Sequence, residues 1–398
     1  MKKIIGIICM ALALTIGVIS VRKTTTEYKY NINAKSRVED TEYAEANIKR
    51  ATELVDLFES NGNILVSPIS LNCVLGMVAN SSDENVKKEV SDYLGINVDE
   101  YNEYVNALIK SAKAKGVLNI ANSVWYDNKY KLNGSFSKNA KKYYVAKVYK
   151  EPMNSSTVKK INRWAYKHTH RLIKQVVDSP PEYIAIFNAT AFDGKWTKKF
   201  KKSDTETEDF TLADGSIKQV SMLNSEESIY YENRYAQGFE KTYGKKGEYS
   251  FIAILPKEEG EFKLADLDIS SFMASRREFD DVSIKLPKFE YEWKSDDLRV
   301  NSKTLDNVLD ELNLSGVKTC KMLENCPAEE MGTLFQKTKI TLDESGTRAV
   351  AVTSFKKVSA VLGDYEKTVY LDRPFAYMIK DNISGEILFV GKYVNPEE

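Results

Sequence analysis

A long connector between two strand-like runs constrains this chain more than any other feature. Residues 335–342 alternate as a strand does, and a second hydrophobic run begins at Phe375. Connectors longer than about 12 to 15 residues inside compact domains are mostly functional or disordered. We therefore expect the connector, residues 343–374, to be either functional or disordered.

The first part of this connector has the residue pattern of a strand. Side chains of an extended segment alternate between two faces, and β-branched residues favour that conformation. One face consists of the small residues Thr347, Ala349, Ala351 and Thr353, and the other of Arg348, Val350, Val352 and Ser354. Gly346 lacks a Cβ and can absorb a large backbone rotation at the start of the segment. The segment could slide between two paired strands, although an ordinary edge strand followed by a loop would have the same pattern.

Four motifs together resemble one family, the serpins. Residues 344–353 (ESGTRAVAVT) resemble the hinge of inhibitory serpins, and residues 372–396 resemble the C-terminal signature of the family. Residues 63–70 (NILVSPIS) and 188–196 (NATAFDGKW) are similar to two further serpin segments. The four lie in the family's order, and the resemblance covers roughly residues 41–396. The chain therefore resembles an inhibitory serpin, of an exported and bacterial-like type.

The resemblance implies a fold and an activity. It implies an α+β fold of about nine helices packed on three mainly antiparallel sheets, in a single domain over residues 41–398 with an exposed reactive-centre loop at about 344–370. It implies a suicide-substrate inhibitor of serine, or cysteine, endopeptidases. The target would cut the loop, and the freed loop would insert into the central sheet. A non-inhibitory serpin acting as carrier, chaperone or storage protein is the alternative, followed by an adhesion module that displays the loop as an epitope.

The resemblance also implies where the target protease cuts. Counting from Glu344 at the usual family spacing places the reactive bond between Ala360 and Val361, whereas counting back from Phe375 places it nearer Gly363. The small side chain of Ala360 suits an elastase-like or subtilisin-like protease. A trypsin-like protease would instead use one of the lysines at 356 and 357.

Further site residues follow from matching the family's motifs. The hinge maps onto Glu344, Gly346, Thr347, Ala349, Val350, Ala351, Val352 and Thr353, and the region through which the sheet opens (shutter and breach) maps onto Ser67, Ser70, Asn188, Trp196 and Gln336. Gln336 stands where serpins usually carry histidine. It can still donate and accept hydrogen bonds, but it cannot titrate. Arg348 likewise replaces the usual glutamate.

The first 40 residues differ from the rest. Two lysines precede the uncharged apolar run 4–21, and Arg22 and Lys23 follow it. This layout predicts a signal peptide over residues 1–22, or a membrane anchor through residues 4–21, followed by a polar tether over 23–40. We expect the protein to be secreted or held on the outer face of the membrane.

Charge and residue counts exclude several functions. Lys plus Arg equals Asp plus Glu at 57 each, so no net basic charge predicts nucleic-acid binding. The only histidines, His168 and His170, lie in a basic, helix-like stretch without a nucleophile or a set of metal ligands, and we expect them at the surface. We therefore expect no enzyme, no cofactor and no metal, and a monomer.

The cysteines have simple interpretations. Cys73 falls in the apolar stripe of a helix and is expected to be a buried thiol. Cys320 and Cys326 close a short loop, which in an exported chain can form a local disulfide, although two free thiols fit equally.

Periodicity predicts helices first and then mostly antiparallel strands, which by itself favours an α+β domain. Three of these segments are expected to be continuous: helices over residues 156–176 and 264–276, and one strand over residues 282–291.

Overall fold

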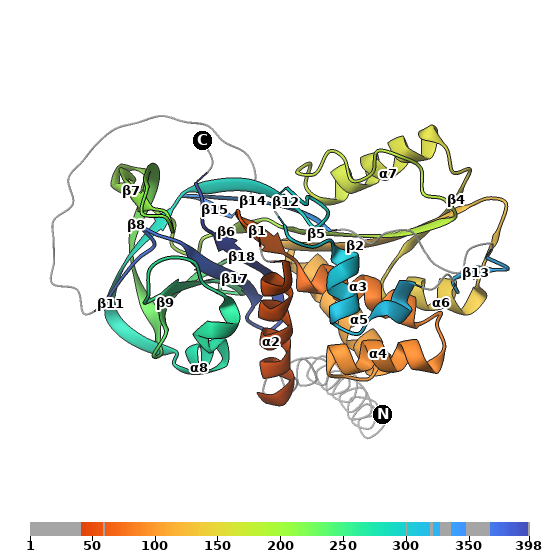
Figure 1. Ribbon diagram of the computed structural model, residues 1–398, viewed down its shortest axis with the longest axis horizontal. Coiled ribbons are helices and arrows are strands. Elements are labelled where there is room, and N and C mark those ends of the chain that lie inside the picture. Colours follow the sequence, from red (N-terminus) through yellow and green to blue (C-terminus); the bar gives the residue numbers. More distant parts are fainter. Residues whose placement is uncertain are drawn as a thin grey trace, which may run out of the picture.

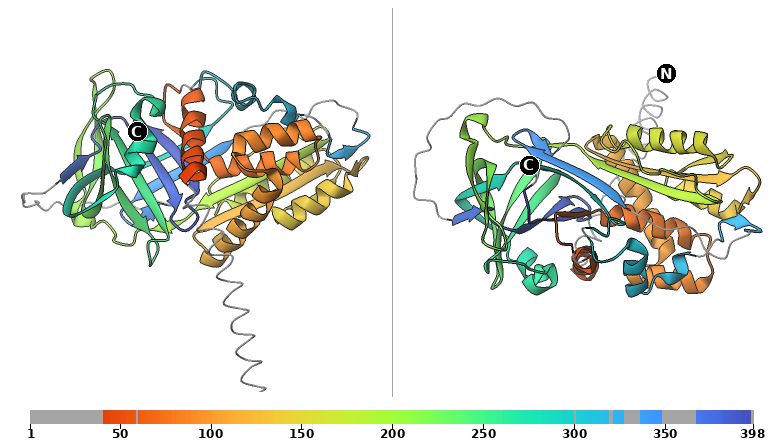
Figure 2. Two further views of the ribbon diagram at one scale, coloured as in Figure 1. Left: turned by 90° about the horizontal axis from the view of Figure 1, so that it is seen from below. Right: turned by 45° about the horizontal axis from the view of Figure 1, so that its top comes forward.

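The computed structural model describes residues 41–58, 60–299, 301–318, 321–326, 336–347 and 367–396. The described part is elongated (Figure 1). A strand-rich half ends in β7 (Glu206–Thr211) and β11 (Arg277–Pro287), and a helix-rich half ends in α6 (Gly134–Tyr143) and β13 (Leu323–Glu324). Two further views show the same division (Figure 2).

Eight α-helices occur in the described residues. They are α2 (Thr41–Phe58), α3 (Pro68–Ala79), α4 (Glu84–Leu94), α5 (Val98–Lys115), α6 (Gly134–Tyr143), α7 (Ser155–His168), α8 (Ile269–Ala274) and α9 (Leu305–Glu311). Three short 3-10 helices add η1 (Lys202–Asp204), η2 (Leu264–Leu267) and η3 (Ser315–Lys318).

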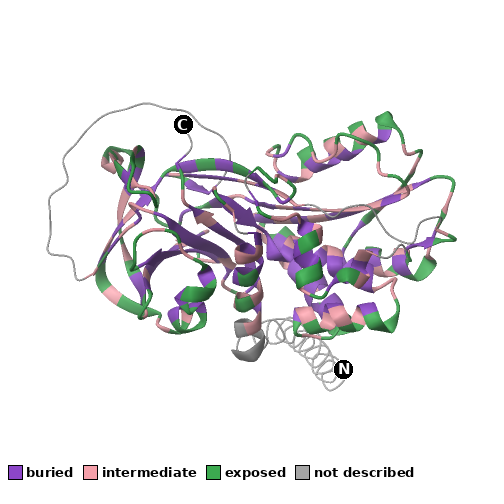
Figure 3. Ribbon diagram, viewed as in Figure 1, coloured by how far each residue is buried: buried purple, intermediate pink, exposed green. Residues whose placement is uncertain are grey.

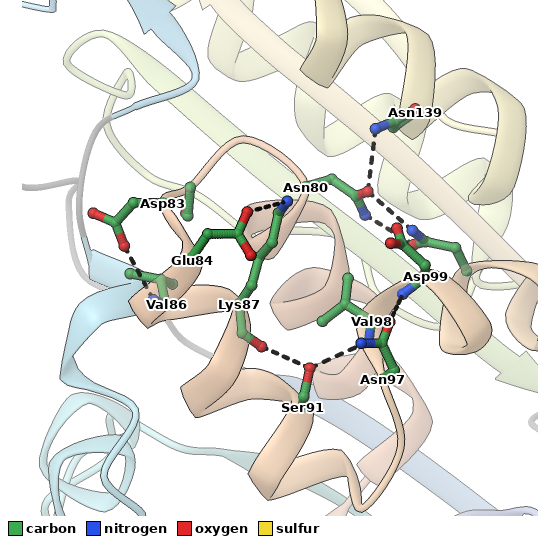
Figure 4. Close-up of polar contacts among 12 residues, drawn as sticks. Asn80, Asp83, Glu84, Val86, Lys87, Ser91, Asn97, Val98, Asp99 and Asn139 are labelled. Carbon is green, nitrogen blue, oxygen red and sulfur yellow. Dashed lines mark hydrogen bonds and ion pairs between the residues drawn. The ribbon is translucent and has the colours of Figure 1, made fainter.

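Side-chain caps explain why several helices begin where they do. Asp83 accepts a hydrogen bond from the Val86 N–H at the start of α4, and Asn97 accepts one from the Asp99 N–H at the start of α5 (Figure 4). Ser91 joins the two helices, since it donates to the Lys87 carbonyl and accepts from the Val98 N–H. Such caps satisfy N–H groups that the helix itself leaves unpaired.

The largest sheet has the order β1-β18-β17-β10-β9-β8-β11-β16, and β7 also pairs with β8. Its strands are β1 (Ile64–Val66), β7 (Glu206–Thr211), β8 (Ile217–Glu232), β9 (Ala236–Tyr243), β10 (Tyr249–Pro256), β11 (Arg277–Pro287), β16 (Lys367–Tyr370), β17 (Phe375–Asp381) and β18 (Ile387–Tyr393). Only β11 and β16 pair in parallel here, so the sheet is mainly antiparallel.

Two smaller sheets carry the region where we place the functional site. One has the order β4-β2-β5 and the other β12-β14-β15-β6. Their strands are β2 (Leu118–Asp127), β4 (Lys147–Glu151), β5 (Ile184–Phe192), β6 (Gly194–Lys195), β12 (Phe289–Lys294), β14 (Lys337–Asp343) and β15 (Gly346–Thr347). A two-stranded ribbon of β3 (Lys131–Leu132) and β13 (Leu323–Glu324) completes the set.

The α+β prediction is confirmed. The described residues hold eight α-helices, close to the nine expected, and four sheets where three were expected. The core is continuous through both halves, and β10, β17 and β18 are almost wholly buried within it (Figure 3).

The three long segments predicted from periodicity are each broken. The helix expected over 156–176 ends at His168, because the following His170 and Arg171 have positive φ angles of 50° and 69°. The helix expected over 264–276 is split into η2 and α8 at Asp268, which also has a positive φ. The strand expected over 282–291 is two strands in different sheets, because Pro287 lacks an N–H for the ladder.

No periodic pattern in the sequence predicts α6. Only Phe136 and Ala140 of this helix are buried, so its apolar stripe is too short to stand out. It starts because the Asn133 side chain accepts hydrogen bonds from the Ser135 and Phe136 N–H groups.

The connector between β14 and β17 contains strand β15 near its start and strand β16 near its end, so the predicted loop 344–370 has strand structure at both ends. Among the described residues, none of the helices has the length and apolar character needed to cross a bilayer. The predicted signal or anchor, residues 1–22, and the tether to residue 40 lie outside the described part of the chain.

Candidate functional site

An opening separates the two smaller sheets. In the described part of the chain, β5 pairs on one edge only, with β2. β14 pairs with β12 from Lys337 to Leu342, and its other edge pairs only with the two residues of β15. The two free edges face each other across cavities lined by residues of both strands. At one end they are bridged by β15, which pairs with β14 on one side and with β6 on the other.

The described part of the bridging strand is two residues long and is tightly enclosed. Thr347 pairs with Leu342 and Gly194, is 3% exposed, and its hydroxyl lies 2.5 Å from the Tyr243 hydroxyl. A Cβ on Gly346 would lie 2.0 Å from the Gly194 carbonyl oxygen. Glycine is therefore required at 346 for close approach of the two backbones. Gly346, at which a large backbone rotation was predicted, thus lies inside the sheet.

Trp196 holds the turn that leads into this strand. Its indole Nε1 donates to the Asp343 carbonyl at 2.9 Å, and its backbone N–H donates to the Ser345 carbonyl at 3.0 Å. Its ring stacks on Tyr243 with centroids 4.1 Å apart. Trp196 and Tyr243 together therefore fix both the start of β15 and the position of Thr347.

A buried lysine lies beneath this aromatic pair. Lys241 is 1% exposed, forms an ion pair with Glu227, and its Nζ lies 4.3 Å from the centre of the Phe200 ring. Burial lowers the pKa of Lys241, while the Glu227 carboxylate acts in the opposite direction. The lysine closes the base of the aromatic cluster with a paired charge.

Two side-chain contacts hold Glu344, two residues before Gly346. Its carboxylate lies 3.2 Å from the Lys288 Nζ, and the Thr205 hydroxyl donates to it at 3.5 Å. Burial opposes ionisation of Glu344, but its own backbone N–H and Lys288 outweigh burial and lower its pKa.

We expect Glu344→Gln to destabilise the intact protein slightly at neutral pH, by about 0.5 to 1 kcal/mol, because Lys288 is partly solvated. Since the folded pKa of Glu344 lies below the ordinary value of 4.5, its contribution is present above about pH 4.5 and is lost as the pH falls through the folded pKa. Thermal melts of variant and parent should therefore differ at pH 7 and converge near pH 3. An undiminished difference at pH 3 would show that the charge is not responsible.

Below β15 the opening widens. A cavity of about 30 Å³ lies next to Thr347 and is also lined by Thr190, Phe192 and Thr341. The Thr341 hydroxyl is buried without a hydrogen-bond partner among the described residues. A larger cavity of about 340 Å³ follows further along β5 and β14. The space that the described residues leave open thus continues along both strand edges from Thr347.

The predicted sheet-opening residues line this larger cavity. Ser67, Ser70, Asn188 and Gln336 all contribute to its wall, whereas Trp196 lies at the other end with the hinge. Gln336 accepts from the Ser67 N–H at 2.8 Å and donates to the Ser67 carbonyl at 2.9 Å. Asn188 lies on the opposite strand and donates to Asn122 at 2.9 Å. Four of the five residues therefore line the larger cavity, and Trp196 alone lies at the hinge end of the opening.

We expect Gln336→Ala to destabilise the intact protein by about 1 to 3 kcal/mol, because both backbone groups of Ser67 lose a partner in a poorly hydrated place. The measurement is thermal unfolding, with the exposed Gln175→Ala as the matched control. Equal midpoints for the two variants would show that the Ser67 contact contributes nothing.

The segment that follows α7 covers the larger cavity from outside the sheet. Trp164 and Ala165 of α7, then Ile173 and Val176, line it. His168 is half-buried with its ring 5.1 Å from Trp164, and His170 has a buried Nε2 without a hydrogen-bond partner among the described residues. Both histidines are partly exposed, so the expected surface position holds only in part, because the break after α7 folds them back toward the sheet.

Several predicted site residues lie outside the described part of the chain. These are the hinge residues Ala349, Val350, Ala351, Val352 and Thr353, the reactive bond at Ala360 and Val361, and Cys320. Cys326 is disulfide-bonded, while its predicted pairing with Cys320 stays a prediction. Cys73 is fully buried, and burial raises its pKa far above the ordinary value, as expected for an unreactive thiol. No cluster of three potential metal ligands occurs in the residues described.

Three residues of the site were missed from the sequence. Tyr243, Lys241 and Lys288 come from strands, or strand ends, that are distant in sequence from the connector. Alternation in β9 could indicate that Tyr243 and Lys241 share one face, but not which residues that face contacts. Their role follows only from the way the sheets meet.

Comparison with known proteins agrees with the geometry of the opening. The family model described as "Serpin (serine protease inhibitor)" matches residues 46–396. Neuroserpin from Homo sapiens is 27% identical, over 84% of this chain and 86% of that protein. An uncharacterised serpin-like protein from Methanosarcina mazei is 29% identical, over 99% of this chain and 98% of that protein.

Solved structures give the same result. The thermophilic serpin tengpin in its native state has a TM-score of 0.74 and 27% identity, over 89% of this chain and 94% of that structure. The same serpin in its latent state has a TM-score of 0.72 at 27% identity, over 89% of this chain and 97% of that structure. The family match extends over most of the chain and includes the hinge, the opening and the C-terminal strands. The chain therefore belongs to the serpin family.

Proposed function

We propose that this serpin is a suicide-substrate inhibitor of serine endopeptidases, with cysteine endopeptidases as a second class of target. The observation that carries the proposal is the position of β15. Two hinge residues, Gly346 and Thr347, already lie between β14 and β6, and an unfilled opening continues from them along β5 and β14. A strand that enters a sheet needs such a start and such a path.

Membership of the family supports the proposal in general terms. The family is one of protease inhibitors and not of enzymes, in agreement with the expectation from the sequence. The small residues at 349, 351 and 353 continue the face of Thr347, so the segment that would follow β15 into the opening carries no bulky side chain on that face.

The proposed reaction begins as ordinary proteolysis. The protease serine attacks the carbonyl carbon of Ala360, the amide bond to Val361 breaks, and the new amino group of Val361 leaves with the proton that the protease histidine transfers. The ester between Ala360 and the protease is the acyl-enzyme. The freed segment then enters the opening beside β5 and carries the tethered protease with it.

The free edge of β5 sets the length and the driving force of this step. β5 has nine residues, which at about 3.3 Å per residue correspond to roughly 30 Å of inserted strand. Each new ladder hydrogen bond contributes a net 0.5 to 1.5 kcal/mol, so about a dozen on the two edges would give on the order of 10 kcal/mol. That is comparable with the stability of an entire domain. The intact protein is therefore kinetically trapped by the continuity of its loop.

The target is proposed from the reactive residue. The methyl side chain of Ala360 fits a shallow specificity pocket, as in elastase-like or subtilisin-like proteases. The basic and apolar start of the chain further supports action outside the cytoplasm, as a secreted or surface-held protein.

Incubation with a subtilisin-like and an elastase-like protease tests the proposal. We expect a denaturant-resistant adduct of both proteins, in which mass spectrometry finds the cut within residues 348–366. Protease whose serine has been blocked beforehand is the control and should give no adduct. A cysteine protease forms a further arm of the experiment. Clean cleavage of the loop without any adduct would contradict inhibition and favour a carrier, chaperone or storage role.

A further inference from the structure

The charges of this chain are segregated, although they balance overall. Residues 129–177 contain eleven lysines and two arginines but only one acidic residue, Glu151, whereas the whole chain has 57 residues of each sign. Local segregation of this kind produces a strong positive potential that the net charge conceals. We call the surface formed by α6, β4 and α7 the basic face.

The basic face wraps around one edge of a sheet. Trp125 of β2 is buried together with Ile161 and Trp164 of α7, whereas the neighbouring Val124 is buried in the main core with α5. Since successive strand residues point to opposite faces, α7 lies on one side of the sheet β4-β2-β5 and α5 on the other. α6 packs on α5, and β4 is the edge strand between them. Figure 1 shows α7 and α6 on opposite sides of these strands.

The basic side chains on α7 form a row. Lys159, Arg163 and Lys167 are exposed and follow one another at intervals of four residues, which corresponds to about 6 Å along a helix. None of the three has an ion-pair partner among the residues that the structure describes. Lys160 does, since it lies 2.6 Å from Glu151. The outer side of α7 is correspondingly exposed in Figure 3.

The row continues onto the edge strand. Lys147 and Lys150 of β4 are exposed and likewise lack an ion-pair partner in the described residues. The charge of Lys147 also acts on His168, on the inner side of α7, because burial, Lys167 and Lys147 together lower the pKa of His168. Uncompensated like charges of this number are destabilising unless a counter-charge binds.

We propose that the basic face binds a linear polyphosphate. A flexible chain can follow a surface that passes from α7 over the edge strand to α6, whereas a flat membrane can contact only one side of it. The excess of lysine over arginine favours phosphate of high charge density, because lysine binds as a point charge without the planar fork that selects particular geometries.

Binding of inorganic polyphosphate, measured at several salt concentrations, tests this proposal. The triple variant Lys159→Gln, Arg163→Gln, Lys167→Gln removes the α7 row. The matched control replaces three exposed lysines elsewhere, Lys110, Lys113 and Lys245, by glutamine. At about 0.7 released counterions per contact, we expect the triple variant to lower the slope of log K against log salt by about 2 and to weaken binding roughly 100-fold at about 0.1 M salt. The control should bind as the parent does.

Three outcomes would overturn the proposal. The first is that polyphosphate shows no salt-dependent binding, and the second is that the triple variant and the control lose equal affinity for polyphosphate. The third is that heparin or phosphatidylglycerol vesicles bind more tightly than polyphosphate at equal anionic charge. Melting curves of all variants establish that each is folded. The test needs no protease, so its result is independent of the proposed inhibition.

Discussion

Replacing Thr347 with arginine is expected to convert the protein from an inhibitor into a substrate. Thr347 is 3% exposed, lies between β14 and β6, and contacts the Tyr243 hydroxyl. In the intact protein an arginine at 347 can leave the edge of the sheet and keep its guanidinium in water, whereas insertion past β15 would bury the guanidinium without a countercharge, which costs several kcal/mol. At 1.4 kcal/mol per factor of ten, the yield of adduct relative to cleavage should fall by about 100-fold or more. Electrophoresis in denaturant measures both products.

Ser345→Arg is the matched control for this substitution. Ser345 is exposed and lies two residues earlier, so it carries the same added charge without entering the sheet. Its adduct yield should stay within about a factor of two of the parent, as expected for surface changes of less than 0.5 kcal/mol. If Thr347→Arg still trapped protease as the parent does, insertion past β15 could not be the trapping step.

Replacing Glu386 with glutamine is expected to stabilise the protein at alkaline pH. Glu386 is 1% exposed, and its Oε2 accepts a hydrogen bond of 2.7 Å from the Tyr104 hydroxyl. Burial raises its pKa from 4.5 to about 7, against the opposing effects of Tyr104 and Arg50. A raised pKa means that this residue's contribution to stability is fully present below about pH 4.5 and is lost as the pH rises through about 7.

The size of this effect follows from the shift. About 2.5 pH units correspond to roughly 3 kcal/mol, which the glutamine variant should gain at pH 8.5 and should not gain at pH 4.5. Thermal melting of the intact protein at both pH values measures it, with the exposed Glu259→Gln as control. A variant that is no more stable than its parent at pH 8.5 would show that the carboxylate is ionised at little cost.

Sequence motifs predicted the site to the extent that function depends on local chain properties. Gly346 and Thr347 lie between two strands and must therefore be small. Their small size can be recognised from the sequence alone. Gln336 was predicted to donate and to accept, and it does both toward Ser67. The function of such residues follows from the size or the hydrogen-bonding groups of their own side chains.

Residues that act through tertiary contacts could not be predicted. Tyr243 and Lys288 reach the hinge only because β9 and the start of β12 lie beside it. The breaks at Asp268 and after His168 depend on left-handed backbone conformations at residues other than glycine, for which sequence has only a weak signal. The passage of the chain from one sheet to another after Pro287 likewise depends on tertiary contacts.

The basic face cannot be recognised from the total charge of the chain. The charges of the whole chain sum to zero, which hides the excess of basic residues between residues 129 and 177. A charge count over windows of about 50 residues shows this excess. The placement on both sides of a sheet edge, in contrast, required the structure.

Thermal unfolding of loop-cleaved and intact protein tests the central claim most directly. If the intact loop withholds a strand from the opening between β5 and β14, cutting it should stabilise the protein by on the order of 10 kcal/mol, from about a dozen new hydrogen bonds. At about 2 °C or more per kcal/mol, the cleaved protein should melt roughly 20 °C higher than the intact one. Identical melting temperatures would contradict the account, because no lower-energy fold would then have been withheld.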